Sequence, residues 1–134
     1  MDPEPQEASP KLIGRQLSWR ILKCAFAVHS ELGPGLLESA YRACLVRELE
    51  LAHLQLTQEV PVPLRYRGSQ IDCGYRADII VEDQVLLELK AVEKLMPIHE
   101  AQLLTYLKLC NLRVGILLNF NSIHLRDGLR RMIR

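Results

Sequence analysis

The sequence has 134 residues, of which 49% are hydrophobic and 25% are charged, and its formal net charge is +1. This length is typical of one domain with one core, which excludes two independent domains, and the near-neutral charge gives no indication of a polyanionic partner. No apolar run approaches the ~20 residues of a membrane-spanning helix, so we expect no contact with a membrane.

The first ten residues differ in composition from the rest of the chain. Residues 1–10 (MDPEPQEASP) are acidic and proline-rich, and they offer almost nothing to bury. We predict a disordered leader over these residues and a single domain over residues 11–134. The acidic start also differs from the basic and apolar start of a signal peptide, so a cytoplasmic location is expected.

Two helices are predicted next. An apolar stripe at three- and four-residue spacing indicates the first helix, from about residue 16 to residue 32, with Trp19 and Phe26 packed inside. The stripe consists of Leu17, Ile21, Ala25, Val28 and Leu32. A proline between two glycines, at residues 33–35, ends this helix, and the second helix follows over residues 36–52. Its inner stripe consists of Leu37, Ala40, Tyr41, Cys44 and Leu45.

Three strands are predicted in the middle of the chain. Residues 59–67 alternate between apolar and polar, but Pro61 and Pro63 restrict them to an edge strand, because proline cannot donate a ladder hydrogen bond. Residues 71–81 and 85–92 are rich in β-branched and apolar side chains, and a short polar turn separates them.

A third helix and a buried strand follow. The helix begins near Pro97, a residue that suits the first helical position, and runs to about residue 109. Residues 113–118 are continuously apolar, which is typical of a strand covered on both faces, and residues 119–134 are expected to add one short helix. The order α-α-β-β-β-α-β predicts an α/β domain with a mixed central sheet flanked by helices.

Three ionisable residues interrupt the two apolar strands: Asp78 lies on one, and Glu88 and Lys90 lie on the other. Side chains two residues apart in a strand share a face. If Val81 pairs with Val85 across the turn, Asp78 lies opposite Glu88 on the same face, with Lys90 one step along.

This pattern favours a metal site that hydrolyses phosphodiester bonds. Two adjacent carboxylates repel each other, and a divalent cation such as Mg²⁺ or Mn²⁺ removes that repulsion. The cation can also lower the pKa of a water molecule, while Lys90 orients that water or neutralises charge on the phosphate. The same three residues are also compatible with a salt-bridged cluster on an exposed sheet face.

Several segments carry a family resemblance. Residues 35–41 have the pattern G-x-x-E-x-x-Y, and the segments GYRADIIVEDQVLLELKAV, HEAQLLTYLK and VGILLNF follow. Over about residues 18–132 the sequence resembles the small family named for that motif, within the PD-(D/E)XK nuclease-like superfamily. The resemblance implies a restriction-endonuclease-like core and an active site of Glu38, Asp78, Glu88 and Lys90. Ala77 stands where the superfamily motif has proline, so the match rests on the Asp and the Glu-x-Lys.

The resemblance also implies roles for residues on the helices. Glu38 would be a metal ligand or a site acid, although a glutamate in the first turn of a helix also suits the helix dipole. Gln102 and Tyr106 are four residues apart, hence on one helical face, and resemble the Q-x-x-x-Y motif of RecB-like nucleases, which approaches the substrate; plain helix packing is the alternative. Some RecB-like enzymes use an upstream histidine as a metal ligand, which makes His29 a secondary candidate.

The four cysteines, Cys24, Cys44, Cys73 and Cys110, are scattered, with no C-x-x-C pair. We interpret them as small apolar residues in or near the core. A cluster that holds iron or zinc is a weaker alternative, because no two cysteines have the spacing of metal ligands.

Two functions are therefore compatible with the sequence. The first is a nuclease that needs Mg²⁺ or Mn²⁺ and acts on DNA or RNA; a chain this small is expected to need a homodimer or an accessory protein to hold a duplex. The second is a non-catalytic module on the same fold that binds nucleic acid or a partner protein, and such a module has no need of a metal.

Overall fold

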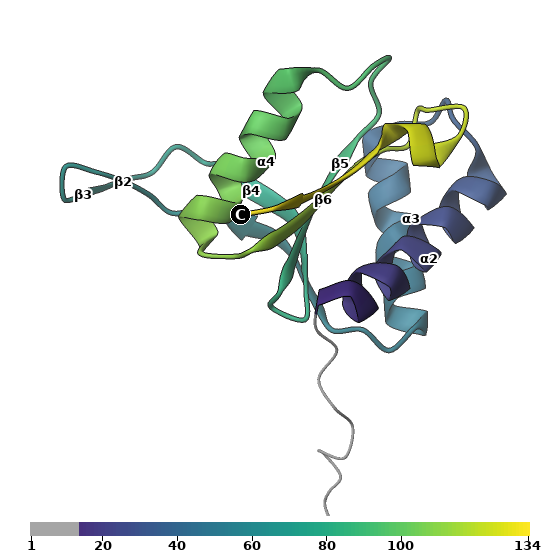
Figure 1. Ribbon diagram of the computed structural model, residues 1–134, viewed down its shortest axis with the longest axis horizontal. Coiled ribbons are helices and arrows are strands. Elements are labelled where there is room, and N and C mark those ends of the chain that lie inside the picture. Colours follow the sequence, from purple (N-terminus) through teal and green to yellow (C-terminus); the bar gives the residue numbers. More distant parts are fainter. Residues whose placement is uncertain (1–13) are drawn as a thin grey trace, which may run out of the picture.

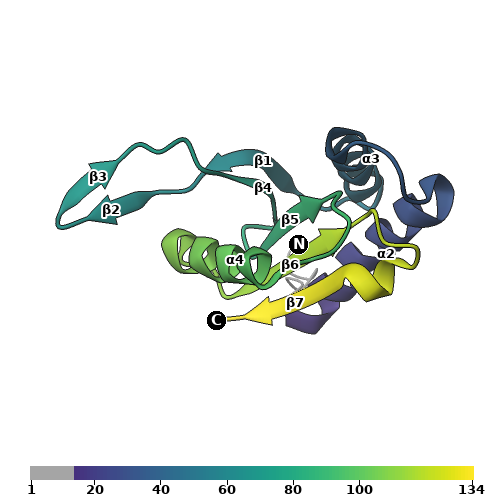
Figure 2. The ribbon, with the colours of Figure 1, turned by 90° about the horizontal axis from the view of Figure 1, so that it is seen from above.

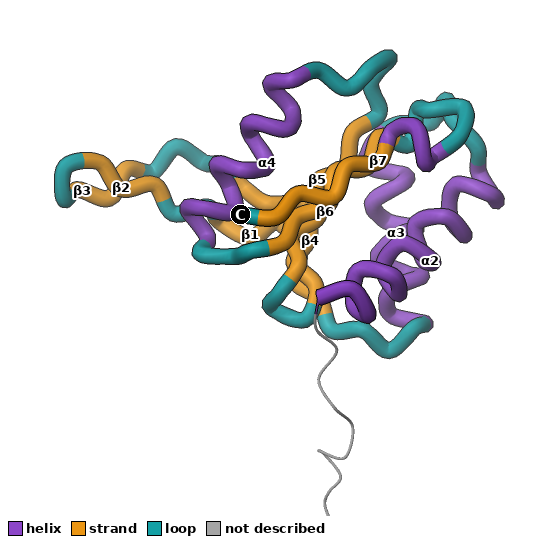
Figure 3. The backbone as a smooth tube through the Cα atoms, in the orientation of Figure 1, coloured by secondary structure: helices purple, strands orange, loops and turns teal. Residues whose placement is uncertain are grey.

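The computed structural model describes residues 14–134, so the leader predicted at residues 1–10 lies outside the described part of the chain. Figures 1 and 3 show the helices and strands of the described part. In chain order these elements are α2 (Gly14–Leu32), α3 (Glu38–Leu51), β1 (Leu56–Pro61), β2 (Leu64–Tyr66), β3 (Ser69–Ile71), β4 (Arg76–Val81), β5 (Val85–Lys90), α4 (Pro97–Cys110), β6 (Val114–Asn119), the 3₁₀ turn η1 (Leu125–Gly128) and β7 (Leu129–Ile133).

Five strands form one mixed sheet between two layers of helices. The strand order is β1-β4-β5-β6-β7; β5 and β6 run parallel, and the other neighbours run antiparallel. Helices α2 and α3 cover one face of the sheet, and α4 covers the other (Figures 1 and 2). The predicted mixed sheet flanked by helices is confirmed.

The alternation of side chains along β5 divides the core into two halves. Leu87 and Leu89 pack beneath α2 and α3, whereas Leu86 packs beneath α4. Each fully buried leucine stabilises the fold by roughly 1.5–3 kcal/mol relative to an exposed one. Gly115 on β6 lets α4 approach closely, because a Cβ there would lie 2.8 Å from a methyl carbon of Leu103.

The predicted helices are found with small differences at their ends. The inner stripe of α2 is buried as expected, apart from the partly buried Leu32. Three other packing predictions are wrong: Leu37 precedes α3 and is 77% exposed, Trp19 is 62% exposed, and Phe26 is also exposed. Trp19 and Phe26 lie on the side of α2 roughly opposite to its buried stripe, which accounts for their exposure.

The strand predicted over residues 71–81 is in fact two strands. The chain turns at Gly74, whose φ of 71° is left-handed, and the Asp72 carboxylate accepts the Gly74 N–H at 3.2 Å. β2 and β3 consequently form a separate hairpin that projects from the main sheet (Figures 1 and 2). The single strand predicted over residues 59–67 is also divided: β1 begins earlier, at Leu56, and ends at Pro61, whereas Leu64–Tyr66 form β2 in the separate hairpin. β1 is an edge strand of the main sheet, as Pro61 predicted.

The helix predicted within residues 119–134 is also corrected. A single 3₁₀ turn, η1, leads into β7, which pairs antiparallel with β6. β7 therefore covers the side of β6 that would otherwise be a buried, unpaired strand edge.

No helix in residues 14–134 is both long enough and apolar enough to span a membrane.

Candidate active site

The candidate site begins where the hydrogen-bonded ladder between β4 and β5 ends. Val81 pairs with Val85, which confirms the predicted register, and the last paired residues are Ile79 and Leu87. Beyond that point β4 continues toward the projecting hairpin while β5 runs toward the start of α4 (Figure 1). The next position along β5 is Glu88, so the carboxylates lie where the two strands separate.

Two carboxylates take the place of the missing ladder bonds. The backbone N–H of Asp78 donates to Oε2 of Glu88 at 3.0 Å, and the N–H of Leu89 donates to Oδ2 of Asp78 at 2.8 Å. Each strand thus satisfies a backbone donor with a side chain of its neighbour. The two bonds hold both carboxylates side by side.

Burial makes this pair electrostatically costly. Glu88 is only 5% exposed, and burial, reinforced by the charge of Asp78, raises its pKa to about 8. Burial also raises the pKa of Asp78, while the hydrogen bond from Leu89 and the charges of Arg42 and Lys90 oppose that rise. The charged forms of these groups therefore need a cation beside them.

Helix α3 contributes two charged side chains, one turn apart. Glu38 lies in its first turn, and its pKa is raised by burial and by Asp78, with Lys90 and Arg42 acting in the opposite direction. Arg42 Nη1 lies 3.6 Å from Oδ1 of Asp78. The apolar pattern of this helix does not single out Arg42, so its contact with Asp78 was not predicted. Arg42 is four residues after Glu38, and residues at this spacing share a helical face. That spacing could have indicated that Arg42 lies near the same site as Glu38.

Helix α4 brings the other predicted residues to the same place. Lys90 Nζ donates to Oε1 of Gln102 at 3.3 Å. Tyr106 is only 7% exposed, and its pKa is raised by burial first and by the charge of Glu88 next. Its ring also lies against that of Tyr75, with 6.1 Å between ring centroids. Tyr106 thus combines core packing with proximity to Glu88 and Asp78, and Gln102 reaches the site through its contact with Lys90.

His29 is placed differently from the other candidates. Its Nε2 lies 2.8 Å from the carbonyl oxygen of Ser122, and its ring lies 6.4 Å from that of Phe120. Among the interactions of residues 14–134, none joins His29 to Asp78 or Glu88. A metal-binding role for His29 therefore remains a prediction from the resemblance alone.

The cysteines do not gather into a site. All four are free; Cys24 is buried and Cys44 and Cys110 are half-buried, but Cys73 is exposed, which corrects its expected place in the core. Within the described part of the chain, no three His, Cys, Asp or Glu side chains form a preassembled metal-binding cluster. That finding gives no support to an iron or zinc site.

The carboxylates nevertheless match a hard divalent cation in their chemistry. Glu38, Asp78 and Glu88 supply only oxygen donors, the ligands that Mg²⁺ and Mn²⁺ prefer. The cluster is not closed around a cation, because one oxygen each of Asp78 and Glu88 accepts a backbone N–H and the other oxygen of Asp78 faces Arg42. Within residues 14–134, the Glu38 carboxylate makes no hydrogen bond or ion pair, so its oxygens are available.

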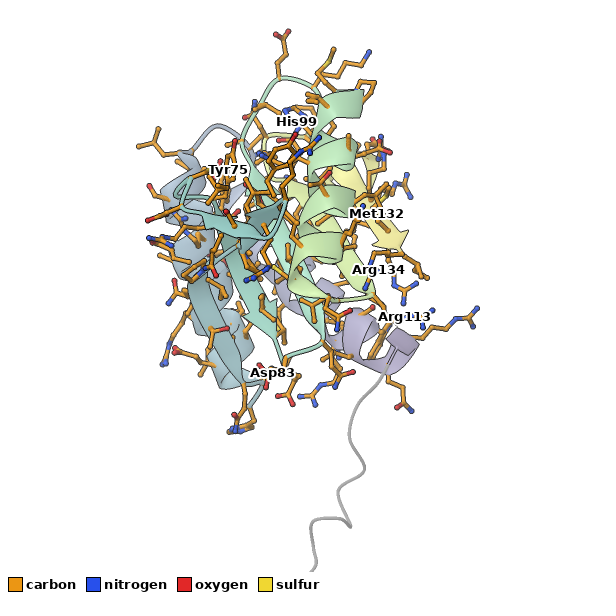
Figure 4. The ribbon with its side chains drawn as sticks, turned by 90° about the vertical axis from the view of Figure 1, so that its left-hand side faces the viewer. Tyr75, Asp83, His99, Arg113, Met132 and Arg134 are labelled. Carbon is orange, nitrogen blue, oxygen red and sulfur yellow. The ribbon has the colours of Figure 1, made fainter. Side chains whose placement is uncertain are left out.

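A hollow on the surface lies away from this cluster. It is lined by residues such as Gln55, Thr57 and Asp83, at the end of β4 opposite to Asp78. Figure 4 shows Asp83 at this far end of the molecule. We therefore define the candidate site by its side chains.

A three-layer α/β fold with acidic and basic side chains where two central strands separate is the architecture of a nuclease-type domain. The family model of the PD-(D/E)XK nuclease superfamily matches residues 15–132, and the chain belongs to this superfamily. Its members generally use divalent metals and act on nucleic acids. Neither the curated proteins nor the solved structures contain a significant match to the chain.

Proposed function

We propose that this protein is a metal-dependent nuclease that hydrolyses phosphodiester bonds in DNA or RNA at the cluster around Asp78 and Glu88. The observation that supports this most strongly is the pair of reciprocal bonds that fixes the two buried carboxylates side by side, with Lys90 next along β5. A purely structural role explains them less well, because the nearby Arg42 and Lys90 offset only part of the cost of burial and the pKa of Glu88 is still raised to about 8.

Asp78 and Glu88 would hold Mg²⁺ or Mn²⁺, with Glu38 as a further ligand from α3. When bound, the cation supplies a water of lowered pKa and neutralises charge on the phosphoryl oxygens. The free carboxylate of Glu38, one helical turn from Arg42, is the side chain best able to adjust to the ion. His29 would require a change of its bond to Ser122 to take part.

Lys90 would act on the attacking water and on the charge that develops at the phosphate. Its ammonium group is directed by the side-chain oxygen of Gln102 at 3.3 Å, so the amide keeps it at the site and not in solvent. Tyr106, between Glu88 and Tyr75, would position the substrate.

We also assign the chain to the G-x-x-E-x-x-Y family within the superfamily, and the structure suggests why that motif contains a tyrosine. The Tyr41 hydroxyl donates to the carbonyl of Gly33 at 2.6 Å and accepts the N–H of Leu36 at 3.1 Å. Its ring stacks on Phe120 with 4.8 Å between centroids. These contacts fix the loop that leads into α3 and so set the position of Glu38.

The test combines metal titration with a cleavage assay. Calorimetric titration with Mg²⁺ and Mn²⁺ compares the wild type with Asp78→Asn combined with Glu88→Gln; both amides can still accept the backbone N–H bonds, so the fold is preserved. Asp83→Asn, in the exposed turn between β4 and β5, is the matched control. We expect the ion to bind the wild type and the control and not the double variant.

Cleavage is then assayed with labelled single- and double-stranded DNA and RNA. We expect Lys90→Ala to abolish cleavage while metal affinity is retained. A wild type that binds no metal, even with nucleic acid present, would refute the proposal and favour the non-catalytic module. Light scattering on the same samples tests whether the active form is a homodimer.

A further inference from the structure

Residues 62–75 leave the main sheet and return to it. Of these residues only Val62, at the base of the excursion, is buried in the core. Pro61 at the end of β1 pairs with Arg76 at the start of β4, so the whole excursion begins and ends at neighbouring positions. Between them, β2 and β3 form the isolated hairpin visible at the left of Figure 1, and its side chains from residue 65 to residue 72 are exposed. A two-stranded hairpin alone is marginally stable, and this one adds no buried side chains from residue 65 to residue 72, so we look for its role outside the core.

The tip of the hairpin carries an exposed aromatic ring, Tyr66, with an arginine on each side of it in the sequence. Tyr66 is 64% exposed, and the Arg67 guanidinium lies 5.7 Å from the centre of its ring, with Nε 3.3 Å from the hydroxyl oxygen. Arg67 and Gly68 both have positive φ, 49° and 81°, as a two-residue type I′ turn requires. Arg65 lies on the other face of β2. The tight turn therefore presents both arginines and the tyrosine at the end of a short arm.

The root of the hairpin is fixed beside the candidate site. The buried Val62 donates its N–H to the carbonyl of Tyr75 at 2.9 Å, and Tyr75 leans on the ring of Tyr106. Tyr75 is 49% exposed, and Figure 4 shows it beside α4. Asp78 follows within the same strand. A strand held along the hairpin would therefore lead to the carboxylates.

The charges on this surface favour nucleic acid over a partner protein. Three exposed arginines extend from the tip to the start of β4: Arg65, Arg67 and Arg76. The nearby Asp72 bonds the Gly74 N–H in the turn. Arginines interleaved with exposed aromatic rings form the kind of surface that binds single-stranded nucleic acid, since phosphates contact the cations and bases stack on the rings.

We propose that the β2–β3 hairpin is an arm that binds a single-stranded segment of nucleic acid and directs it to the site. Bases stack on Tyr66 and Tyr75, and the arginines contact the phosphates. This inference rests on the proposed function for what happens at the carboxylates, but binding to the arm is measurable without cleavage.

The experiment measures binding of fluorescent oligonucleotides of about 12 nucleotides, single- and double-stranded, by anisotropy in the presence of a chelator that prevents metal-dependent cleavage. We expect single strands to bind more tightly than duplexes. Tyr66→Ala should weaken single-strand binding roughly 5- to 100-fold, and Tyr66→Phe should retain it, because stacking needs the ring and not the hydroxyl. Trp19→Ala, an exposed aromatic residue on α2, is the matched control and should bind normally.

Salt dependence tests the arginines. The double variant Arg65→Gln with Arg67→Gln should lower the slope of log affinity against log salt by about 1.4, because each phosphate contact to a single strand contributes ~0.7. Arg113→Gln is the control, because Arg113 is exposed and lies far from Tyr75 in Figure 4. Its slope should equal that of the wild type.

The outcomes separate this inference from the proposed function. Weakened binding by the hairpin variants supports the arm even if Mg²⁺ or Mn²⁺ never produces cleavage. Normal binding by Tyr66→Ala and by the arginine pair refutes the arm, even if the wild type cleaves. The arm is also refuted if the wild type binds no oligonucleotide or binds duplexes more tightly than single strands. It is refuted as well if the hairpin variants change the oligomeric state and leave the affinity for nucleic acid unchanged.

Discussion

Asp78 and Glu88 lie on adjacent antiparallel strands, and the Glu88 carboxylate accepts the backbone N–H of Asp78 at the point where the β4–β5 ladder stops. The reciprocal bond from Leu89 to Asp78 completes the connection. One oxygen of each carboxylate thus closes the sheet, and Asp78 has a second function because its other oxygen faces Arg42 of the candidate site. This arrangement makes the geometry of the site part of the stability of the sheet.

The two functions of Asp78 can be separated by substitution. Asp78→Ala should be less stable than Asp78→Asn by about 1–3 kcal/mol, because alanine leaves the buried N–H of Leu89 without an acceptor whereas asparagine retains one. Urea unfolding of the metal-free proteins measures the difference. Equal stability of the two variants would show that the bond to Leu89 contributes nothing.

Stability of the metal-free protein should fall as pH rises. The pKa of Glu88 is about 8 in the folded protein and near 4.5 for an ordinary glutamate, so the folded state binds the proton more tightly than the unfolded state. The stabilisation from this group is complete below about pH 4.5 and is lost as pH rises through about 8, a change on the order of a few kcal/mol. Urea unfolding with a chelator, at several pH values across this window, measures it.

The control for this pH dependence is Glu88→Gln, which removes the titrating group. Its stability should vary less with pH than that of the wild type, although Asp78 and Glu38 have pKa shifts in the same direction and will leave some dependence. Saturating Mg²⁺ should reduce the dependence in the wild type. An identical pH profile for Glu88→Gln and the wild type would contradict the assignment of the raised pKa to Glu88.

Sequence periodicity was sufficient for the layers of the fold and for the register of the central hairpin. The burial of Leu17 and Ile21 and the pairing of Val81 with Val85 follow from local patterns of apolar residues. Periodicity did not separate β3 from β4, because a single turn at Gly74 interrupts a segment that otherwise reads as one strand. It also missed β7, whose pairing with β6 is a long-range contact without a strong local pattern.

For the site, the sequence shows which charged residues interrupt apolar segments. It does not show which side-chain atoms come into contact. Lys90 and Gln102 come from different elements, and only the packing of α4 over β5 brings them together. Arg42 was missed because an arginine on an amphipathic helix ordinarily faces solvent. The contact with Asp78 depends on where β4 separates from β5, which no local pattern indicates.

Arg42 should compete with the metal for Asp78. Its guanidinium lies 3.6 Å from Oδ1, so removal of this charge leaves the oxygen free and reduces repulsion of a divalent cation. Arg42→Gln should therefore bind Mn²⁺ more tightly, by about fivefold, which corresponds to roughly 1 kcal/mol for a partly exposed pair. Calorimetric titration measures the affinity.

Arg47→Gln provides the comparison for Arg42, because it removes an exposed arginine from the same helix. We expect its affinity for Mn²⁺ to equal that of the wild type. Weaker metal binding in Arg42→Gln would mean that the arginine organises the carboxylates and does not compete with the ion.

Gln102 should affect cleavage through Lys90. Gln102→Leu removes the acceptor that lies 3.3 Å from Nζ of Lys90, so the ammonium group is no longer held in one direction. The single-turnover rate at saturating metal should therefore fall about 10- to 100-fold, and the affinity for metal should not change. The decisive measurement is a double-mutant cycle of Gln102 and Lys90. In each variant it measures the affinity for a non-cleaved substrate analogue and the residual rate of cleavage. In a Lys90→Arg background, which keeps the charge but changes the reach of the side chain, Gln102→Leu should have a much smaller additional effect. An undiminished effect there would show that Gln102 acts independently of Lys90, through packing of α4 or through its own contact with the substrate.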